Sequence, residues 1–193
     1  MTNNFDHATF LSAIKDAEPS EQLVFQYLNE HDMWVETSYT MTPKAEQKAG
    51  VRNGWHIADI TTEGDIAIEV KEDKASGRTG NLCFEASCLK RLSRWAIAND
   101  KSETYVAYIN HRDYGLDIFR LSELMAELKY LTKIGDARRI KGGDQHHALY
   151  LVPLSRVRTM SSNYYCCIGD AQWEAFQNDA VQLLNPERRY AYD

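Results

Sequence analysis

Polar and apolar side chains alternate over residues 66–71, and the rest of the chain can be organised around this stretch. An alternation with a period of two is typical of a strand that buries one face, and here the other face carries Glu69 and Lys71 side by side. A second short apolar run, 55–60, contains Asp59 and is separated from the first by a Thr-Thr-Glu-Gly-Asp turn. We therefore expect two adjacent strands that hold Asp59 against Glu69.

The remaining pattern predicts a mixture of helices and strands. Helical spacing of apolar residues predicts helices over 21–31, 81–98, 121–131 and 173–184 with a short one within 1–18, and apolar runs predict strands over 34–41, 103–110, 116–120 and 148–154. Residues 42–54 and 72–80 are polar and are expected to be loops. The short connection after the second long helix suits a strand-helix-strand crossover.

Two glutamates occupy unusual helical positions. Glu85 falls on an apolar stripe, three residues after Leu82 and four before Leu89. A carboxylate on a core-facing stripe needs a counter-charge, a proton or a metal ion. A pair with an arginine such as Arg78, or a place at the rim of the core, is the structural alternative. Glu21 lies along the edge of another stripe, where it is either a helix-dipole partner or a member of a site.

Composition places the chain among ordinary globular proteins. Its 193 residues suffice for one substantial core, so a single domain is expected. The apolar fraction is 44% and the charged fraction 26%, and no apolar run approaches the roughly 18 residues of a membrane span. The polar start lacks the features of a signal peptide, which predicts a cytoplasmic protein. Cys83, Cys88, Cys166 and Cys167 form no Cys-x-x-Cys pair and are interpreted as small core residues.

Charge is distributed unevenly. The formal net charge of −6 argues weakly against a nucleic-acid partner, but the acidic excess lies within residues 1–100. Basic residues dominate 129–158 and 74–94, where a phosphate backbone could be bound or where the surface is merely solvated. The candidate nucleic-acid contacts are Lys74, Arg78, Arg138, Arg139 and Lys141.

The carboxylates predict a hard metal ion. Asp59, Glu69 and Glu85 supply oxygen ligands of the kind that Mg²⁺ or Mn²⁺ prefers. Lys71, two residues from Glu69 on the same strand face, could orient a water or neutralise charge that develops on a phosphate. These are the components of a phosphodiester hydrolysis site. A Glu-x-Lys pair alone is commonplace on exposed strands, so the prediction depends on the order of the elements around it.

That order, together with the spacing Asp-x9-Glu-x-Lys, resembles the PD-(D/E)XK nuclease superfamily over residues 20–110. The segments Glu-Val-Lys-Glu-Asp (69–73) and Thr-Gly-Asn-Leu-Cys-Phe-Glu (79–85), with Gly-Gly-Asp (142–144) and Leu-Val-Pro-Leu (151–154), are similar to small nuclease-like proteins of phages and mobile elements. The sequence departs from the superfamily's name in one place, because Ala58 and not proline precedes Asp59.

The resemblance implies an α/β fold: a restriction-endonuclease-like α-β-β-β-α-β core with a central mixed sheet flanked by helices, and C-terminal strand and helix additions over 111–185. It implies Mg²⁺ or Mn²⁺ as cofactor, Asp59 and Glu69 as metal ligands and Lys71 as the catalytic lysine. Glu85 and Glu21 would be auxiliary acids. Asp65, in the turn four residues before Glu69, is an alternative to Asp59.

The implied activity is endonucleolytic cleavage of DNA. Branched or otherwise structured DNA, the kind of substrate that resolvases cut, is the expected target, and RNA is the alternative. A homodimer is expected if two strands must be cut, and a phage-encoded protein would work in the host cytoplasm. A different class of function is a catalytically inactive module that keeps this fold to bind nucleic acid or a protein. A third interpretation makes the basic segment 129–158 the main functional surface.

Overall fold

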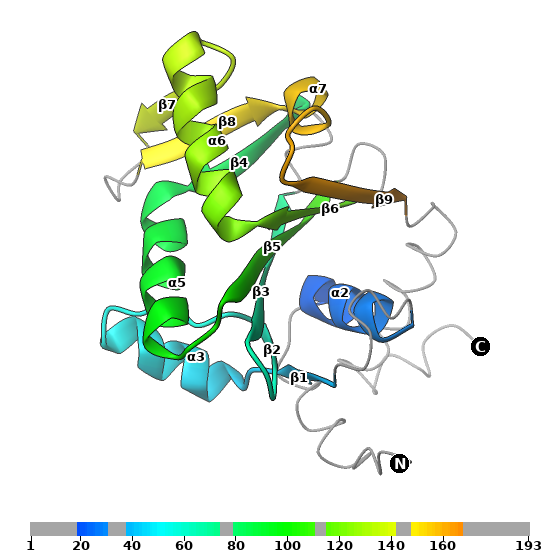
Figure 1. Ribbon diagram of the computed structural model, residues 1–193, viewed down its shortest axis with the longest axis vertical. Helices are drawn as coiled ribbons and strands as arrows, with labels where there is room; N and C mark the ends of the chain where they lie inside the picture. The colour runs from blue at the N-terminus through cyan, green and yellow to red at the C-terminus, as the bar shows by residue number, and fades with distance from the viewer. Residues whose placement is uncertain (1–18, 31–37, 74–78, 111–114, 142–147, 168–193) are drawn as a thin grey trace, which may run out of the picture.

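The computed structural model describes residues 19–30, 38–73, 79–110, 115–141 and 148–167 (Figure 1). The elements in chain order are α2 (Pro19–Glu30), β1 (Tyr39–Met41), α3 (Lys44–Arg52), β2 (Ile60–Thr62), β3 (Ile66–Asp73), β4 (Asn81–Glu85), α5 (Ala86–Ala98), β5 (Glu103–Asn110), β6 (Gly115–Arg120), α6 (Leu121–Ile134), β7 (Arg138–Lys141), β8 (Ala148–Pro153), α7 (Leu154–Val157) and β9 (Asn163–Cys167). The helices predicted within 1–18 and over 173–184 lie outside the described residues.

The central sheet is mixed and has six strands in the order β1-β2-β3-β5-β6-β9. Only the β3–β5 pair is parallel among these neighbours, and its register sets Glu69 opposite Val106 and Lys71 opposite Tyr108. α5 provides the connection between the two parallel strands, as a strand-helix-strand crossover requires. The predicted crossover is therefore confirmed.

Helices cover both faces of this sheet, α2 on one side and α5 on the other (Figure 1). The alternation in β3 explains the division, because Ile68 and Val70 join the core beneath α2 whereas Ala67 joins the core beneath α5 and α6. Glu69 and Lys71 share the parity of Ala67 and belong to the α5 side of the strand. The predicted α/β fold with a central mixed sheet flanked by helices is confirmed.

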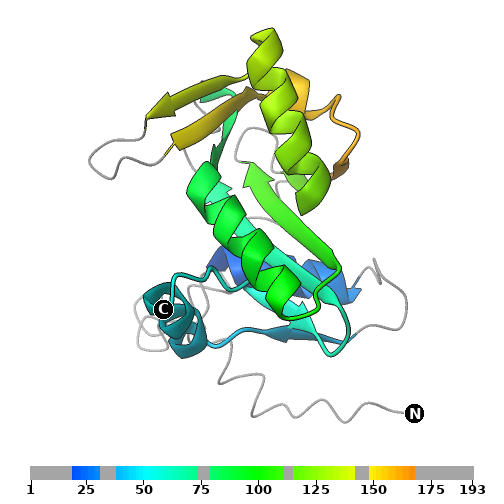
Figure 2. The ribbon, with the colours of Figure 1, turned by 60° about the vertical axis from the view of Figure 1, so that its left-hand side comes forward.

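A second sheet, of order β4-β8-β7, is antiparallel and lies beyond the N-terminal end of α5 (Figure 2). Phe84 of β4 connects it to the main core through edge-to-face contacts with Tyr108 and Phe119, whose ring centroids are 5.2 and 5.6 Å away. The backbone N–H of Cys83 also donates to the Tyr108 hydroxyl at 3.1 Å. The second sheet thus packs on the α5 face, whereas the later strands β6 and β9 extend the central sheet.

Three local predictions were wrong. Residues 44–52 form the helix α3 and not a loop. The prediction failed because a short, mostly polar helix shows no clear helical period of apolar residues. Residues 81–85 form β4, so the following helix begins at Ala86 and not near Asn81. The strand before the turn begins at Ile60 and continues through Thr62, so Asp59 precedes it. The predicted order helix-strand-strand-strand-helix-strand is nevertheless preserved, with α3 and β4 inserted.

Among the described helices, none is long and apolar enough to cross a membrane.

Candidate active site

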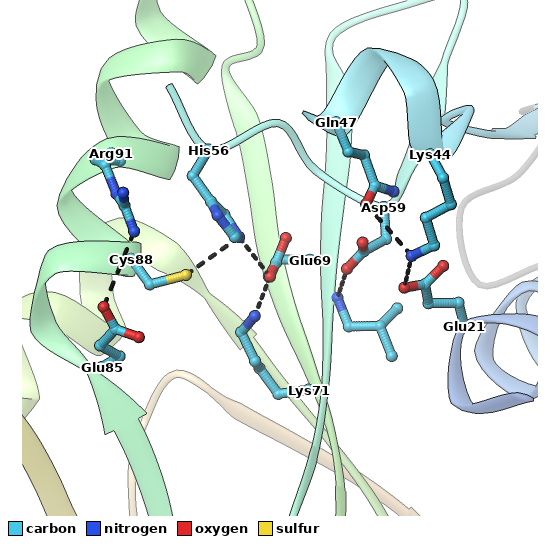
Figure 3. Close-up of polar contacts among 11 residues, drawn as sticks. Glu21, Lys44, Gln47, His56, Asp59, Glu69, Lys71, Glu85, Cys88 and Arg91 are labelled. Carbon is cyan, nitrogen blue, oxygen red and sulfur yellow. Dashed lines mark hydrogen bonds and ion pairs between the residues drawn. The ribbon is translucent and has the colours of Figure 1, made fainter. Parts of the chain in front are cut away.

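Glu69 and Lys71 emerge from the middle of β3 on the face turned toward α5 (Figure 3). Glu69 is 1% exposed, and its Oε1 accepts a hydrogen bond from the Lys71 ammonium. Residues i and i+2 of a strand share a face, which explains why the pair predicted from sequence lies side by side. β3 is flanked by β2 and β5, so the acid lies deep in the sheet and not on a solvated edge.

Asp59 is held against the same strand. Its Oδ2 accepts the backbone N–H of Val70 at 2.8 Å, and its side chain is buried. The antiparallel β2–β3 register pairs Ile60 with Ile68, and continuing that register by one residue places Asp59 opposite Glu69. Burial, followed by the nearby charges of Glu69 and Glu21, raises the pKa of Asp59 well above its usual value. Two acids from adjacent segments therefore meet at one place, as the sequence predicted.

Glu21 approaches this place from α2. It is 6% exposed, forms an ion pair with Lys44 of α3, and is close enough to Asp59 to raise the pKa of that carboxyl. Lys44 Nζ also lies 3.3 Å from Gln47 Oε1, one turn further along α3. Glu21 is thus near the acidic pair, but a lysine from an unpredicted helix already partners it.

His56 and Cys88 bring nitrogen and sulfur to the other side of Glu69 (Figure 3). His56 Nε2 lies 2.6 Å from Glu69 Oε1 and 3.1 Å from Cys88 Sγ. Burial alone would lower the pKa of His56, but its hydrogen bonds to Cys88 and Glu69 and the Glu69 charge raise it to about 10. The possible ligand atoms of these three residues all lie within 4.8 Å of one another.

Glu69 is the electrostatic centre of the arrangement. Burial alone would raise its pKa, but the positive charges of Lys71 and His56 hold it below its usual value. The pKa of Lys71 is raised in turn. Burial alone would lower it, but the negative charge of Glu69 more than offsets that effect. At neutral pH the carboxylate is ionised and carries two hydrogen-bonded cationic neighbours.

One oxygen of this carboxylate is unpartnered. Glu69 Oε2 is buried and has no hydrogen-bond partner among the described residues, whereas Oε1 interacts with both Lys71 and His56. A buried acceptor without a donor is costly unless a ligand satisfies it. Asp59, Glu69 and the nearby Glu21 offer carboxylate oxygens, the ligand type that hard divalent cations prefer. Among the described residues, however, the side chains whose possible ligand atoms lie within 4.8 Å of one another are His56, Glu69 and Cys88.

Glu85 differs from its predicted placement. It is the last residue of β4 and precedes the first turn of α5, so it does not lie on a buried helical stripe. Its side chain is 34% exposed, accepts a hydrogen bond from the Ser87 hydroxyl and lies 3.9 Å from Arg91. Figure 3 places Glu85 on the Cys88 side of Glu69, whereas Asp59 and Glu21 are on the other side. Glu85 is not among the described side chains whose possible ligand atoms lie within 4.8 Å of one another, and its role as a metal ligand stays a prediction.

Asp65 and the basic candidates lie elsewhere. Asp65 is exposed, accepts a hydrogen bond from Ser102 and precedes the first residue of β3, four positions before Glu69. Of the predicted DNA contacts, Arg138, Arg139 and Lys141 belong to β7, the outer strand of the second sheet. Lys74 and Arg78 lie outside the described residues.

Sequence reasoning missed His56, Cys88, Lys44 and Gln47. His56 lies three residues before Asp59, and this proximity is the signal that could have drawn attention to it. Cys88 is buried, as predicted for a core cysteine, yet its sulfur contacts the imidazole. Lys44 and Gln47 were missed because α3 was expected to be a loop.

Comparisons with known proteins leave the family open. No protein-family model matches the chain, and no curated protein matches it. Among solved structures, a likeness extends to D212, a nuclease from a fusselovirus, with a TM-score of 0.42 and 10% sequence identity over 84% of this chain and 88% of that one. A likeness this distant concerns the arrangement of the backbone alone.

Proposed function

We propose that this chain is a metal-dependent nuclease that hydrolyses phosphodiester bonds in DNA as an endonuclease. The observation that carries the proposal is the convergence of Asp59, Glu69 and Lys71 on one stretch of β3, with a buried oxygen of Glu69 left without a partner. Two carboxylates can bind a hard cation, and the lysine can offer a positive charge to a phosphate.

Asp59 and Glu69 would hold a Mg²⁺ or Mn²⁺ ion. When bound, such an ion lowers the pKa of water and polarises a phosphoryl oxygen. The protein prepares the ligands in advance: the Val70 N–H fixes Asp59, and Lys71 and His56 keep Glu69 ionised although it is buried. Metal binding would also offset the repulsion that raises the pKa of Asp59.

Lys71 is the proposed catalytic residue. Its ammonium stays protonated because Glu69 raises its pKa, so it acts as a hydrogen-bond donor and not as a base. From β3 it can orient an attacking water or neutralise the charge that builds on the phosphate. Glu21 is proposed as an auxiliary acid that shapes the local field through Asp59.

DNA binding would also need a positive surface. Arg138 and Arg139 are exposed on β7, the outer strand of the second sheet. We propose them as backbone contacts. Reversing both charges should lower DNA affinity and reduce its dependence on salt, and an unchanged salt dependence would remove this surface from the proposal.

Cleavage of supercoiled plasmid and of synthetic branched DNA with Mg²⁺ tests the activity. Lys71→Met should reduce the rate by about 100-fold or more, because a preorganised charge is lost from the site. Lys90→Met removes the same charge from an exposed position on α5 and serves as the matched control. Equal rates for wild type and Lys71→Met would refute the assignment. A preference for the branched substrate would support a structure-selective enzyme.

One observation favours an inactive binding module as the second candidate. Lys71 and His56 both interact with the same oxygen of Glu69, so the carboxylate is neutralised by the protein itself. Calorimetric titration with Mn²⁺ separates the two candidates. Binding that disappears in Asp59→Asn and Glu69→Gln supports the nuclease, and absence of such binding in the wild type supports the module.

A further inference from the structure

A mixed set of nitrogen, oxygen and sulfur atoms lies on the side of Glu69 away from Asp59. His56 Nε2, Glu69 Oε1 and Cys88 Sγ come from three separate segments: the chain before β2, the strand β3 and the helix α5. Glu69 and Cys88 are buried and His56 is partly buried. The hard-cation site proposed above uses neither an imidazole nor a thiol as a metal ligand, so the contact of Cys88 with His56 calls for a separate explanation.

Hydrogen bonding does not satisfy the group fully. His56 Nε2 carries at most one hydrogen, and that hydrogen lies between two neighbours, Glu69 Oε1 at 2.6 Å and Cys88 Sγ at 3.1 Å. Glu69 Oε2 has no partner among the described residues. A cation placed among the three ligand atoms could bond to all of them at once.

We propose that His56, Glu69 and Cys88 form a binding site for a thiophilic divalent cation of the Zn²⁺ class. Histidine nitrogen, cysteine sulfur and a carboxylate oxygen are the ligand types that zinc takes in proteins, with water completing a tetrahedron. Around such an ion neighbouring ligand atoms lie about 3.3–3.6 Å apart. The observed separations of 2.6 and 3.1 Å therefore need to open by less than about 1 Å.

The binding step is an exchange of protons and a cation. Zn²⁺ forms bonds to Nε2, Oε1 and Sγ, while the Cys88 thiol and a protonated His56 Nε2 release their protons to solvent. The Lys71 ammonium, which bonds to the same Oε1, is displaced because two cations compete for one oxygen. Lys71 therefore opposes zinc binding, and its removal should strengthen it.

The site shares Glu69 with the proposed hard-cation site, and this sharing predicts regulation. Zinc would draw Glu69 away from Asp59 and drive Lys71 from its position, so it would inhibit Mg²⁺-dependent cleavage. This regulatory consequence rests on the proposed nuclease function, whereas zinc binding itself does not. His56 and Cys88 are offered as zinc ligands and not as catalytic residues.

Cobalt spectroscopy tests the site without requiring activity. Co²⁺ added to the reduced, full-length protein should produce a thiolate-to-cobalt charge-transfer band that Zn²⁺ abolishes by competition. Cys88→Ser and His56→Gln should each weaken Co²⁺ binding by at least about tenfold, and Cys88→Ser should remove the band. Cys83→Ser changes the other free cysteine of the described residues, and this variant should retain the charge-transfer band. Lys71→Met should bind Co²⁺ more tightly than the wild type.

Two results would overturn the assignment: no band in the wild type, or an equal band in Cys88→Ser when circular dichroism shows both proteins folded. Zinc inhibition is then measured in wild type and Cys88→Ser, each relative to its own rate with Mg²⁺ alone. Strong inhibition of the wild type and at least about tenfold weaker inhibition of the variant support the regulatory consequence. Equal inhibition contradicts it. If the protein cleaves no DNA, the cobalt result still decides the metal site.

Discussion

Val70 donates its backbone N–H to Asp59 Oδ2 at 2.8 Å, so the strand that carries Glu69 and Lys71 also fixes the second acid. The side chains of these two residues have different surroundings. Val70 packs in the core beneath α2, whereas the Asp59 carboxyl interacts with the charges of Glu69, Glu21 and Lys71. A one-residue shift of register would carry Glu69 into that core. Core packing and site geometry are therefore determined by the same alternation.

The charge of Asp59 should destabilise the metal-free protein. Its raised pKa means that the folded state disfavours ionisation, because Asp59 is buried beside Glu69 and Glu21. Asp59→Asn keeps an acceptor for the Val70 N–H, and we expect it to raise the free energy of unfolding in EDTA at neutral pH by about 1 kcal/mol. Urea denaturation measures this change. Asp65→Asn is the control, since Asp65 is exposed and its pKa is lowered. A less stable Asp59→Asn protein would contradict the electrostatic account.

Lys44 should matter to stability through Glu21. The glutamate is 6% exposed, and the ion pair with Lys44 connects α2 to α3. Lys44→Met leaves that carboxylate without its cation and is expected to lower the free energy of unfolding by about 1–2 kcal/mol. The double variant Glu21→Gln/Lys44→Met should recover part of the loss. Chemical denaturation of both, with Lys48→Met on the exposed face of α3 as control, checks the expectation. An unchanged free energy of unfolding in Lys44→Met would show that the ion pair does not stabilise the fold.

Much of this arrangement follows from sequence because it depends on local periodicity. The alternation over 66–71 predicted that Glu69 and Lys71 share a face, and the spacing to Asp59 predicted the second acid. Glu85 shows where this reasoning fails: Leu82 and Leu89 fit a helical stripe equally well when one lies on β4 and the other on α5. Short apolar runs do not distinguish a strand from a helical turn.

The contacts of His56 and Cys88 could not be predicted for a different reason. The two residues are 32 positions apart, and their 3.1 Å contact depends on how α5 crosses the sheet beside the segment that precedes β2. No local pattern encodes such a crossing. The ion pair between Glu21 and Lys44 is also non-local, because its members are 23 positions apart in the sequence.

Acid should weaken the attachment of the segment that leads into β9. Glu127 of α6 accepts hydrogen bonds from the Ser161 N–H at 2.8 Å, the Ser161 hydroxyl at 2.7 Å and the Ser162 hydroxyl. Burial alone would raise the pKa of Glu127, but these bonds lower it below its usual 4.5. A lowered folded pKa contributes stability that is present above pH 4.5 and is lost as the pH falls through the folded value.

Glu127→Gln should therefore be less stable than the wild type at pH 7, by about 1 kcal/mol given the partial exposure of the carboxylate. The difference should shrink steadily below pH 4.5, where the wild-type carboxyl gains a proton. Thermal unfolding of both proteins at several pH values between about 3 and 7 measures the trend. A difference that is constant over this range would mean that the charge of Glu127 is unimportant.

The central claim is that Asp59 and Glu69 bind the cation with which Lys71 cleaves DNA, and the most direct measurement is Mg²⁺-dependent cleavage of supercoiled plasmid by Asp59→Asn and Asp65→Asn. Both variants remove one carboxylate charge near β3, but only Asp59 is held beside Glu69. We predict a loss of about 100-fold or more for Asp59→Asn and a rate close to wild type for Asp65→Asn. Equal rates for the two variants, or a larger loss in Asp65→Asn, would contradict the account.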